Sequence, residues 1–362
     1  MDDLLDYISD EPLKTAIIRT GKLIEQNEWL LQLTERLEQL LFDESGTTSY
    51  WNCYLEHKAE IDSLLEEDKD CYLAYVSKVA FPRLQQYYAR LGIPHHIMAA
   101  TLADIDLRAH NYRMMFGGVG IDDYRWMTNH ITGRIFQIGR LQYIYSRKFA
   151  FNSRIYRHRQ SGLLLKIAEG NLFVDEQGFI TNEQQAVFQT TLIENEHQVT
   201  GNIIDEKGNI TNTRVEIAYA NYENVVQSGD AVIDIHIPAS GKMEYNDCLA
   251  SLEAAFTFAQ TYFPDMKFRG FVCSSWLLSD EVMEMLPETS NLVRFSGSFI
   301  RCAGRHSDHE LIYKWIFGMD KEKHDYKSHV PITTLQRGTH QLLDQGRWFE
   351  KRTGFITPEV FL

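Results

Sequence analysis

The sequence predicts an α+β protein of two domains, an all-helical domain over residues 1–150 and a domain of strands and crossover helices over residues 151–362. Three observations lead to this fold class. A chain of 362 residues is too long for one ordinary domain. Apolar residues recur at helical spacing through the first part of the chain. From Phe149 onward, β-branched residues and turn residues dominate instead.

The first 150 residues contain several apolar patterns of helical period. Leucines recur at three- and four-residue steps between Leu23 and Leu41, with Glu and Gln between them. The segment 72–91 predicts a helix that ends at Gly92 and Pro94. The helical period continues over 96–115 and is broken by the glycine cluster 117–120. Residues 123–146 predict one more helix.

The second half predicts strands first and helices later. Residues 170–182 and 201–212 share an Asp-Glu-x-Gly sequence between apolar runs, which predicts two similar hairpins in one sheet. A strand, a short loop, a helix and a second strand are then expected over 231–276. The remaining expected elements are a short helix over 278–286, strands over 291–299 and 311–317, and a helix over 334–343.

Composition limits the classes of function. Hydrophobic residues make up 44% and charged residues 24%, as in soluble globular proteins. No apolar run reaches the roughly 18 residues that a membrane span needs, and the acidic N-terminus does not resemble a secretory signal. Five cysteines without C-x-x-C spacing favour a reducing compartment, so we expect the cytoplasm. A net charge of −14 argues against nucleic-acid binding.

The charge is unevenly spread along the chain. Residues 124–168 contain nine Lys and Arg and no Asp or Glu. One interpretation is a groove for an anionic ligand such as a phosphorylated cofactor. The other is a basic segment that docks against the acidic helices of residues 1–70.

The loop between the strand ending near Pro238 and the following helix is the first candidate site. It consists of small residues and one cation: Pro238, Ala239, Ser240, Gly241 and Lys242. A loop of this kind leaves backbone N–H groups free at a helix N-terminus, where a phosphate can bind. The other interpretation is a turn that binds nothing. The loop lacks the spacing of a P-loop, which argues against nucleotide hydrolysis.

Polar residues at the two strand ends are the candidates for chemistry. His236, two residues after Asp234, is placed to accept a proton from an amine or hydroxyl, although a hydrogen-bonded core histidine is the competing interpretation. Ser275 or Ser274 would protonate a leaving group or orient a carbonyl. Cys273 with His236 would form a thiolate pair, but its position in the strand predicts burial.

The five histidines between His306 and His340 are scattered, and only His306 and His309 are close, with an aspartate between them. A solvated polar loop explains this run as well as metal binding does. We therefore expect no metal site.

Several segments together resemble one protein family. Ser228–Met243 is similar to the family's run GD-x-V-x-(E/D)-I-H-I-P-x-G-G-x-(L/M), and Phe263–Leu278 to its run F-P-x-x-x-F-x-x-F-V-C-x-S-W-L-L. The segments 286–295, 334–337 and 346–348 also fit. The chain thus resembles bacterial two-domain acyltransferases, which combine a helical N-acyltransferase N-terminal domain with a GNAT-like C-terminal domain built on a curved mixed sheet.

The resemblance covers nearly the whole chain and implies acyl transfer from acyl-CoA to an amine or hydroxyl acceptor. His236 and Ser275 would then be the catalytic residues, and the loop 238–242 would hold the CoA phosphates. The sequence departs from the pattern in two places. The loop lacks the Q/R-x-x-G-x-G/A signature of ordinary GNAT enzymes, and Ser274 stands where relatives often carry His.

These departures keep two alternatives open. One is a non-catalytic protein that binds a small ligand on a GNAT-like shell. The other is a hydrolase that uses Cys273 or Ser275 with His236, although the chain lacks a G-x-S-x-G nucleophile elbow. In each case the expected partner is a small molecule rather than nucleic acid or a membrane. No sequence feature predicts the oligomeric state, the acyl group or the acceptor.

Overall fold

The computed structural model describes residues 2–43, 47–307, 312–318 and 325–361, with only the backbone for 305–307 and 312–314. The chain divides into two compact units. The first comprises Met1–Ile138, Pro238–Gly241 and Gly318–Asp320, and the second comprises the rest of the chain. Among the described residues, no helix combines the length and the apolarity that crossing a bilayer requires.

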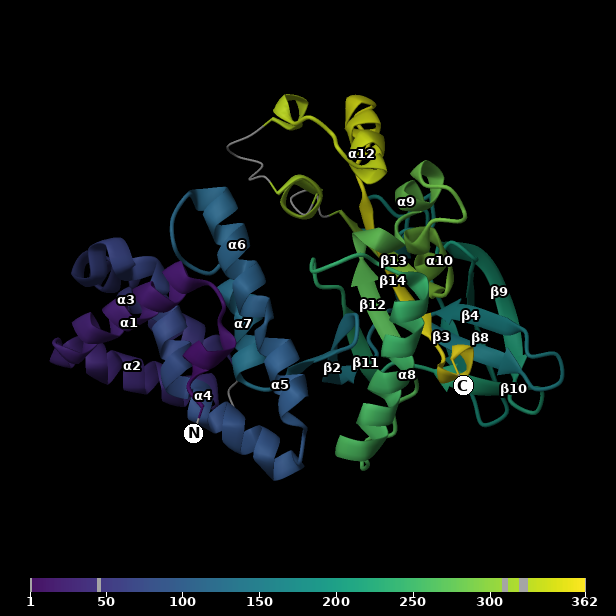
Figure 1. The fold of residues 1–362 in the computed structure, drawn as a ribbon. Coiled ribbons are helices and arrows are strands. Elements are labelled where there is room, and N and C mark those ends of the chain that lie inside the picture. Colours follow the sequence, from purple (N-terminus) through teal and green to yellow (C-terminus); the bar gives the residue numbers. More distant parts are fainter. Residues whose placement is uncertain (1, 44–46, 308–311, 319–324, 362) are drawn as a thin grey trace. The chain divides into compact units, whose positions relative to one another are not determined.

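The first unit is helical, as predicted (Figure 1). Its α-helices are α1 (Glu11–Glu25), α2 (Glu28–Leu41), α3 (Thr47–Leu65), α4 (Tyr72–Leu91), α5 (His95–Leu102), α6 (Asp104–Phe116) and α7 (Tyr124–Ile131). The short 3₁₀ helices η1 (Leu4–Tyr7) and η2 (Glu66–Cys71) and the strand β1 (Ile135–Ile138) complete it.

Local sequence sets the ends of these helices. The side chain of Asp10 accepts a hydrogen bond from the Leu13 amide at the start of α1, and Asn27 caps α2 in the same way. Gly92 adopts a left-handed conformation with φ of 72° and ends α4 at the predicted residue. The left-handed Gly92 explains why the C-terminal boundary of α4 follows directly from the sequence.

The helix predicted over residues 123–146 is wrong. Helix α7 ends at Ile131, and the chain continues into β1 and β2 (Leu141–Lys148). Gly133 and Gly139, with φ of 68° and 61°, separate these elements. A left-handed glycine stops a helix, so the isoleucines at helical spacing in this segment belong to two different elements.

The second unit contains a mixed sheet, which confirms the predicted α+β class. Within this unit its strand order is β2-β11-β12-β14-β13. Strands β11 and β12 are parallel, and the other neighbours are antiparallel. The new strands are β11 (Ala231–His236), β12 (Phe271–Ser275), β13 (Ile300–Ser307) and β14 (Glu350–Ile356).

Helix α8 (Tyr245–Tyr262) covers one face of this sheet. The hydroxyl groups of Tyr143 and Ser251 are 2.7 Å apart, and the Tyr145 hydroxyl donates to the Ala255 carbonyl. The connection from β11 through α8 to β12 is therefore the predicted strand–loop–helix–strand unit. The unit's other helices are η3 (Trp276–Leu278), α9 (Asp280–Met285), α10 (Asn291–Gly297), η4 (Ile312–Phe317), η5 (Tyr326–Ser328), α12 (Thr334–Asp344) and η6 (Pro358–Val360).

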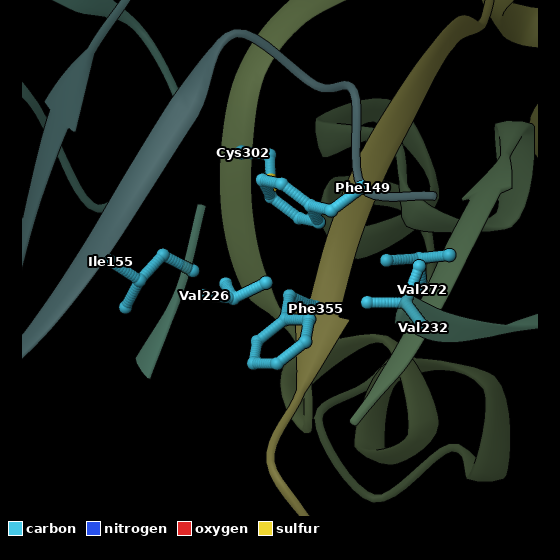
Figure 2. Packing of buried hydrophobic residues seen from close by; sticks show 7 residues of the cluster. All are labelled: Phe149, Ile155, Val226, Val232, Val272, Cys302 and Phe355. Atoms are coloured by element: carbon cyan, nitrogen blue, oxygen red, sulfur yellow. The ribbon is translucent and has the colours of Figure 1, made fainter. Parts of the chain in front are cut away.

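A second sheet has the strand order β10-β3-β4-β8-β7, and β9 also pairs with β8. Its strands are β3 (Ser153–His158), β4 (Leu164–Ala168), β7 (Leu192–Glu194), β8 (Gln198–Ile204), β9 (Ile210–Ala218) and β10 (Tyr222–Val226). A buried cluster joins the two sheets: Figure 2 shows Ile155 and Val226 on one side of Phe355, and Val232 and Val272 on the other. This cluster lies on the sheet face that α8 does not cover.

The two predicted hairpins do not share a sheet. The turn at residues 205–208 joins β8 and β9, whereas the turn at 175–178 is flanked by a single bridge between Val174 and Ile180. Val174 also belongs to β5 (Phe173–Val174), which pairs with β6 (Phe188–Gln189). The two turns instead touch each other, because the Ile210 amide donates to the Gly178 carbonyl.

Two further predicted strands are helical. Residues 291–299 contain α10, in which Val293 and Ser296, three positions apart, are both buried. Residues 312–317 form the π-helical turn η4, and Leu311 lies outside the described residues. A short apolar run fits either a strand or a buried helix, so periodicity alone does not separate the two.

Candidate active site

The two parallel strands at the centre of the main sheet part before they end. Strand β11 pairs with β12 at Ile233↔Phe271 and Asp234↔Val272, and the ladder recorded between them stops there. Each strand then keeps only its outer neighbour: His236 stays opposite Gln142 of β2, and Ser274 stays opposite Thr353 of β14. The divergence leaves main-chain edges of two strands facing each other. An extended ligand with amide groups can bind such an edge as an added strand does.

His236 is the last residue of β11 and lies at this divergence. Its Nε2 atom is 3.5 Å from Oδ2 of Asp234, which lies on the same face of the strand because side chains alternate. The His236 side chain is 30% exposed, so a substrate can reach it. An imidazole within reach of a substrate can accept a proton from a bound nucleophile.

The five residues predicted to hold phosphate do not belong to one compact unit. Pro238, Ala239, Ser240 and Gly241 group with the first unit, whereas Lys242 begins the next segment of the second. Gly241 has φ of 73°, a conformation that favours glycine. Their joint role in binding CoA stays a prediction.

The N-terminus of α8 follows this loop in the chain. Glu244 occupies the N-cap position without a side-chain hydrogen bond to the helix, so the first amides of α8 are not capped by it. Arg140 lies nearby, because its Nε atom donates to the Lys242 carbonyl over 2.8 Å. The Lys242 side chain is exposed. Helix amides and two cations favour an anion at this position, and the carboxylates of Glu244 and Asp247 in the same helix start oppose it.

A shallow depression of about 400 Å³ runs beside the first turns of α8. It is lined by Gly139, Arg140, Asp247, Ala250, Ser251 and Ala254. Ala250 and Ala254 are one helical turn apart, and their small side chains leave the helix surface open. This depression, named the α8 depression below, has room for a small-molecule ligand.

The predicted serines lie on opposite faces of β12. Ser274 shares the face of Asp234 and His236, and its hydroxyl is 2.9 Å from that of Thr353. Ser275 lies on the other face, and its hydroxyl accepts a hydrogen bond from the Leu277 amide. The structure therefore does not bring Ser275 and His236 together. The assignment of Ser275 as a catalytic hydroxyl stays an untested prediction that this geometry does not favour.

The cysteine in the same strand is not placed to act as a nucleophile. Cys273 is 1% exposed, and burial raises the pKa of its thiol well above the usual range. It lies on the face of Ser275, opposite to His236. This arrangement argues against the hydrolase alternative. Among the residues described, no cluster of metal-binding side chains occurs, and the histidine pair considered above includes His309, which lies outside them.

Sequence reasoning missed two buried arginines near the end of β12. Arg352 of β14 is paired with Ser275. Arg301 of β13 is paired with Gly354, which is in turn paired with Cys273. Both are more than nine-tenths buried; burial, opposed by the nearby Asp280, lowers the pKa of Arg301. Asp280 also accepts from Arg352 over 3.1 Å. An arginine inside an apolar strand run was the available signal.

The basic segment 124–168 docks mainly within its own half of the chain. Arg154 pairs with Glu169 and Glu194, and Arg157 pairs with Glu223 and Glu359. These acidic partners come from the second unit rather than from residues 1–70. For Arg154 and Arg157, the partners therefore differ from those expected for docking against residues 1–70.

Comparison with known proteins supports the resemblance seen in the motifs. Residues 135–356 match the family model of the GNAT-like C-terminal domain, and residues 1–133 match that of the N-acyltransferase N-terminal domain. A search of curated proteins finds no match.

Several solved structures share the fold. An acyltransferase mutant in complex with octanoyl-CoA has a TM-score of 0.63 at 16% identity, covering 97% of this chain and 85% of that one. An acyltransferase with decanoyl-CoA and teicoplanin has a TM-score of 0.60 at 16% identity, with the same coverage. A third, with decanoyl-CoA, has a TM-score of 0.54 at 18% identity, covering 80% of this chain and 66% of that one. The chain therefore belongs to the family that joins an N-acyltransferase N-terminal domain to a GNAT-like C-terminal domain.

Proposed function

We propose that this protein transfers an acyl group from acyl-CoA to an amine or hydroxyl acceptor. The observation that carries the proposal is the divergence of β11 and β12, with His236 at its open end and the N-terminus of α8 next in the chain. The family supports the same reaction class. The proposal concerns acyl donors as a class and leaves the acceptor undefined.

Acyl-CoA suits this arrangement because one end of the molecule carries phosphates and the other carries the thioester. The phosphates of CoA would bind near the α8 N-terminus, where Arg140 and Lys242 supply positive charge. The extended, amide-containing arm would lie between the parting strands and hydrogen-bond to their main chains. The thioester would then reach the end of β11. Related folds were crystallised with octanoyl-CoA and decanoyl-CoA, so medium-chain donors are the first to try.

In the proposed reaction the acceptor attacks the thioester carbonyl directly. A C–N or C–O bond forms and the C–S bond breaks, while His236 takes the proton of the attacking group and Asp234 stabilises the imidazolium. The leaving CoA thiolate takes up a proton to become the thiol. Holding both substrates in line supplies a large part of the acceleration.

We also propose that the protein works in a reducing compartment, for which the cytoplasm is the simplest choice. All five cysteines are free and buried.

The test combines binding with turnover on the full-length protein. Thermal shift is measured with free CoA, acetyl-CoA, octanoyl-CoA and decanoyl-CoA, with ATP as a control. A ligand at about 100 times its Kd should stabilise the folded state by about 2.7 kcal/mol. Thiol release is then followed with a panel of amines and alcohols.

A shift with acyl-CoA together with acceptor-dependent thiol release would support the transferase. Binding of CoA species without turnover for any acceptor would favour the ligand-binding alternative, for which the residue at Ser274 is the motivating observation. The absence of any shift would overturn the proposal.

A further inference from the structure

The helical unit contains a pocket of its own, which the acyl-transfer proposal does not use. Its volume is about 370 Å³, within the range of small-molecule sites. The residues that line it come from α3, η2, α4, α6 and α7 and the segment before α7 (Figure 1). Those that determine its chemistry are Trp51, Tyr54, Asp70, Tyr112, Asp123 and Tyr124. We call it the aromatic pocket.

The walls of this pocket are rigid aromatic rings. Trp51 and Tyr54 of α3 are in contact with ring centroids 5.8 Å apart and planes at 83°, so they form two sides of a corner. Leu73 and Ile121, both buried, supply the apolar base. A ligand with a hydrophobic body therefore gains contact area without ordering flexible side chains.

One ring already holds a cation. The guanidinium carbon of Arg125 lies 5.3 Å from the centroid of Trp51. This is the geometry of a cation–π contact, and it shows that the face of Trp51 attracts positive charge in this environment. Arg125 itself lines the pocket, as does Lys69.

Two carboxylates accompany the rings. Asp70 is exposed and hydrogen-bonds to Tyr112, whose pKa is raised by burial and by this carboxylate. Asp123 caps α7 by accepting from the Trp126 amide over 3.3 Å. Lys69 and Arg125 balance the formal charge of these carboxylates, and Arg108 lies 3.9 Å from Asp123. The preference for a cation therefore rests on the π faces together with the exposed Asp70.

We infer that the aromatic pocket binds an organic cation with a hydrophobic body, such as an arylalkyl or alkylated amine. The ammonium group would lie against the aromatic faces and near Asp70 and Asp123, and the hydrophobic body would contact Leu73 and Ile121. The residues that line the aromatic pocket and those that line the α8 depression are different. Its occupancy does not depend on the acyl-transfer proposal.

The experiment measures binding to the full-length protein without any CoA species, by titration calorimetry. The probes are phenethylammonium, the neutral 3-phenylpropan-1-ol and the anionic 3-phenylpropanoate, which share a ring and a short chain. We expect phenethylammonium to bind at least tenfold more tightly than the other two. Equal or tighter binding of the carboxylate, or no measurable binding of the amine, would overturn the inference.

Variants locate the site. Asp123→Asn keeps a side chain that can cap α7 and that tolerates the φ of 50° at this position. Asp70 is exposed, so Asp70→Asn should not disturb the fold. The double variant should weaken binding of the amine at least fivefold and leave the affinity for the alcohol unchanged. Trp51→Phe should weaken amine binding several-fold, while the matched Trp29→Phe change on α2 should not. Amine affinity that both sets of variants leave unchanged would contradict the assignment.

Discussion

The two hollows of this chain have similar sizes and opposite chemistry. The aromatic pocket, of about 370 Å³, is walled by Trp and Tyr rings with carboxylates beside them. The α8 depression, of about 400 Å³, is lined by Ala, Ser and Gly, with Arg140 and Asp247 at its sides. Volume alone would assign them the same kind of ligand. We infer a cation for the first from its rings and carboxylates, and an anion for the second from Arg140 and the N-terminus of α8.

The difference arises from how each hollow is made. The aromatic pocket forms between large rings that pack edge to face, as Trp51 and Tyr54 do. The α8 depression exists because Ala250 and Ala254 leave space on a helix that is otherwise packed on the sheet. A rigid aromatic wall selects by surface chemistry, whereas a surface of small residues allows close approach of a helix and its dipole.

The largest expected effect tests whether the chemistry takes place where β11 and β12 diverge. His236→Ala should reduce acyl transfer by about 10²–10⁴-fold, because general-base assistance is lost while donor binding is kept. Turnover and the acyl-CoA Kd are measured on the same sample. The matched control is His197→Ala, an exposed histidine in the turn between β7 and β8. Turnover that survives His236→Ala would remove this residue from the mechanism and separate the chemistry from the strand divergence.

The next effect tests the depression as a donor site. Ala250→Phe fills the space beside α8 and should weaken acyl-CoA binding at least tenfold, which is about 1.4 kcal/mol. Gln260→Phe, near the far end of the same helix and exposed, is the control for adding an aromatic ring. Binding of phenethylammonium to the aromatic pocket should not change in either variant. Equal donor affinity in the two variants would show that the donor does not occupy the depression.

A smaller effect tests the charge of the depression. Arg140→Met keeps an unbranched aliphatic stem but removes the cation, and it should weaken acyl-CoA binding several-fold and reduce its dependence on salt. Burial already lowers the pKa of Arg140, so an anion nearby would compensate a desolvated charge. Affinities at two salt concentrations provide the measurement. Lys267→Met in the loop after α8 is the control, and a salt dependence equal in both variants would contradict the anion site.

Some of this arrangement was available from the sequence, and some was not. The helix α4 was predicted with its boundaries, because Gly92 provides a local stop signal. The prediction of one helix over 123–146 is wrong because Gly133 and Gly139 adopt left-handed conformations that end the elements there. Local rules describe a helix or a turn, but they do not fix pairing between distant segments. For that reason the separation of the two hairpins into different sheets was not foreseen.

The candidate site shows the same limit at the level of single residues. The motif drew attention to the ends of β11 and β12, and His236 is the last residue of β11. Which face of a strand a side chain occupies depends on register, which the sequence did not specify. Arg352 and Arg301 come to the end of β12 only through pairing of β12, β14 and β13, segments up to about 80 residues apart in the chain.

The smallest expected effect separates the two serines that the sequence treated alike. Ser275→Ala removes the hydroxyl that accepts from the Leu277 amide, so it should lower the free energy of unfolding by about 1 kcal/mol. Because this hydroxyl lies on the face opposite to His236, acyl transfer should remain within about twofold of the unchanged protein. Denaturant unfolding and turnover are measured together, with Ser274→Ala as the matched variant on the His236 face. A large loss of turnover at unchanged stability in Ser275→Ala would reverse this assignment, since it would require the acyl group to approach from the α8 side of the sheet.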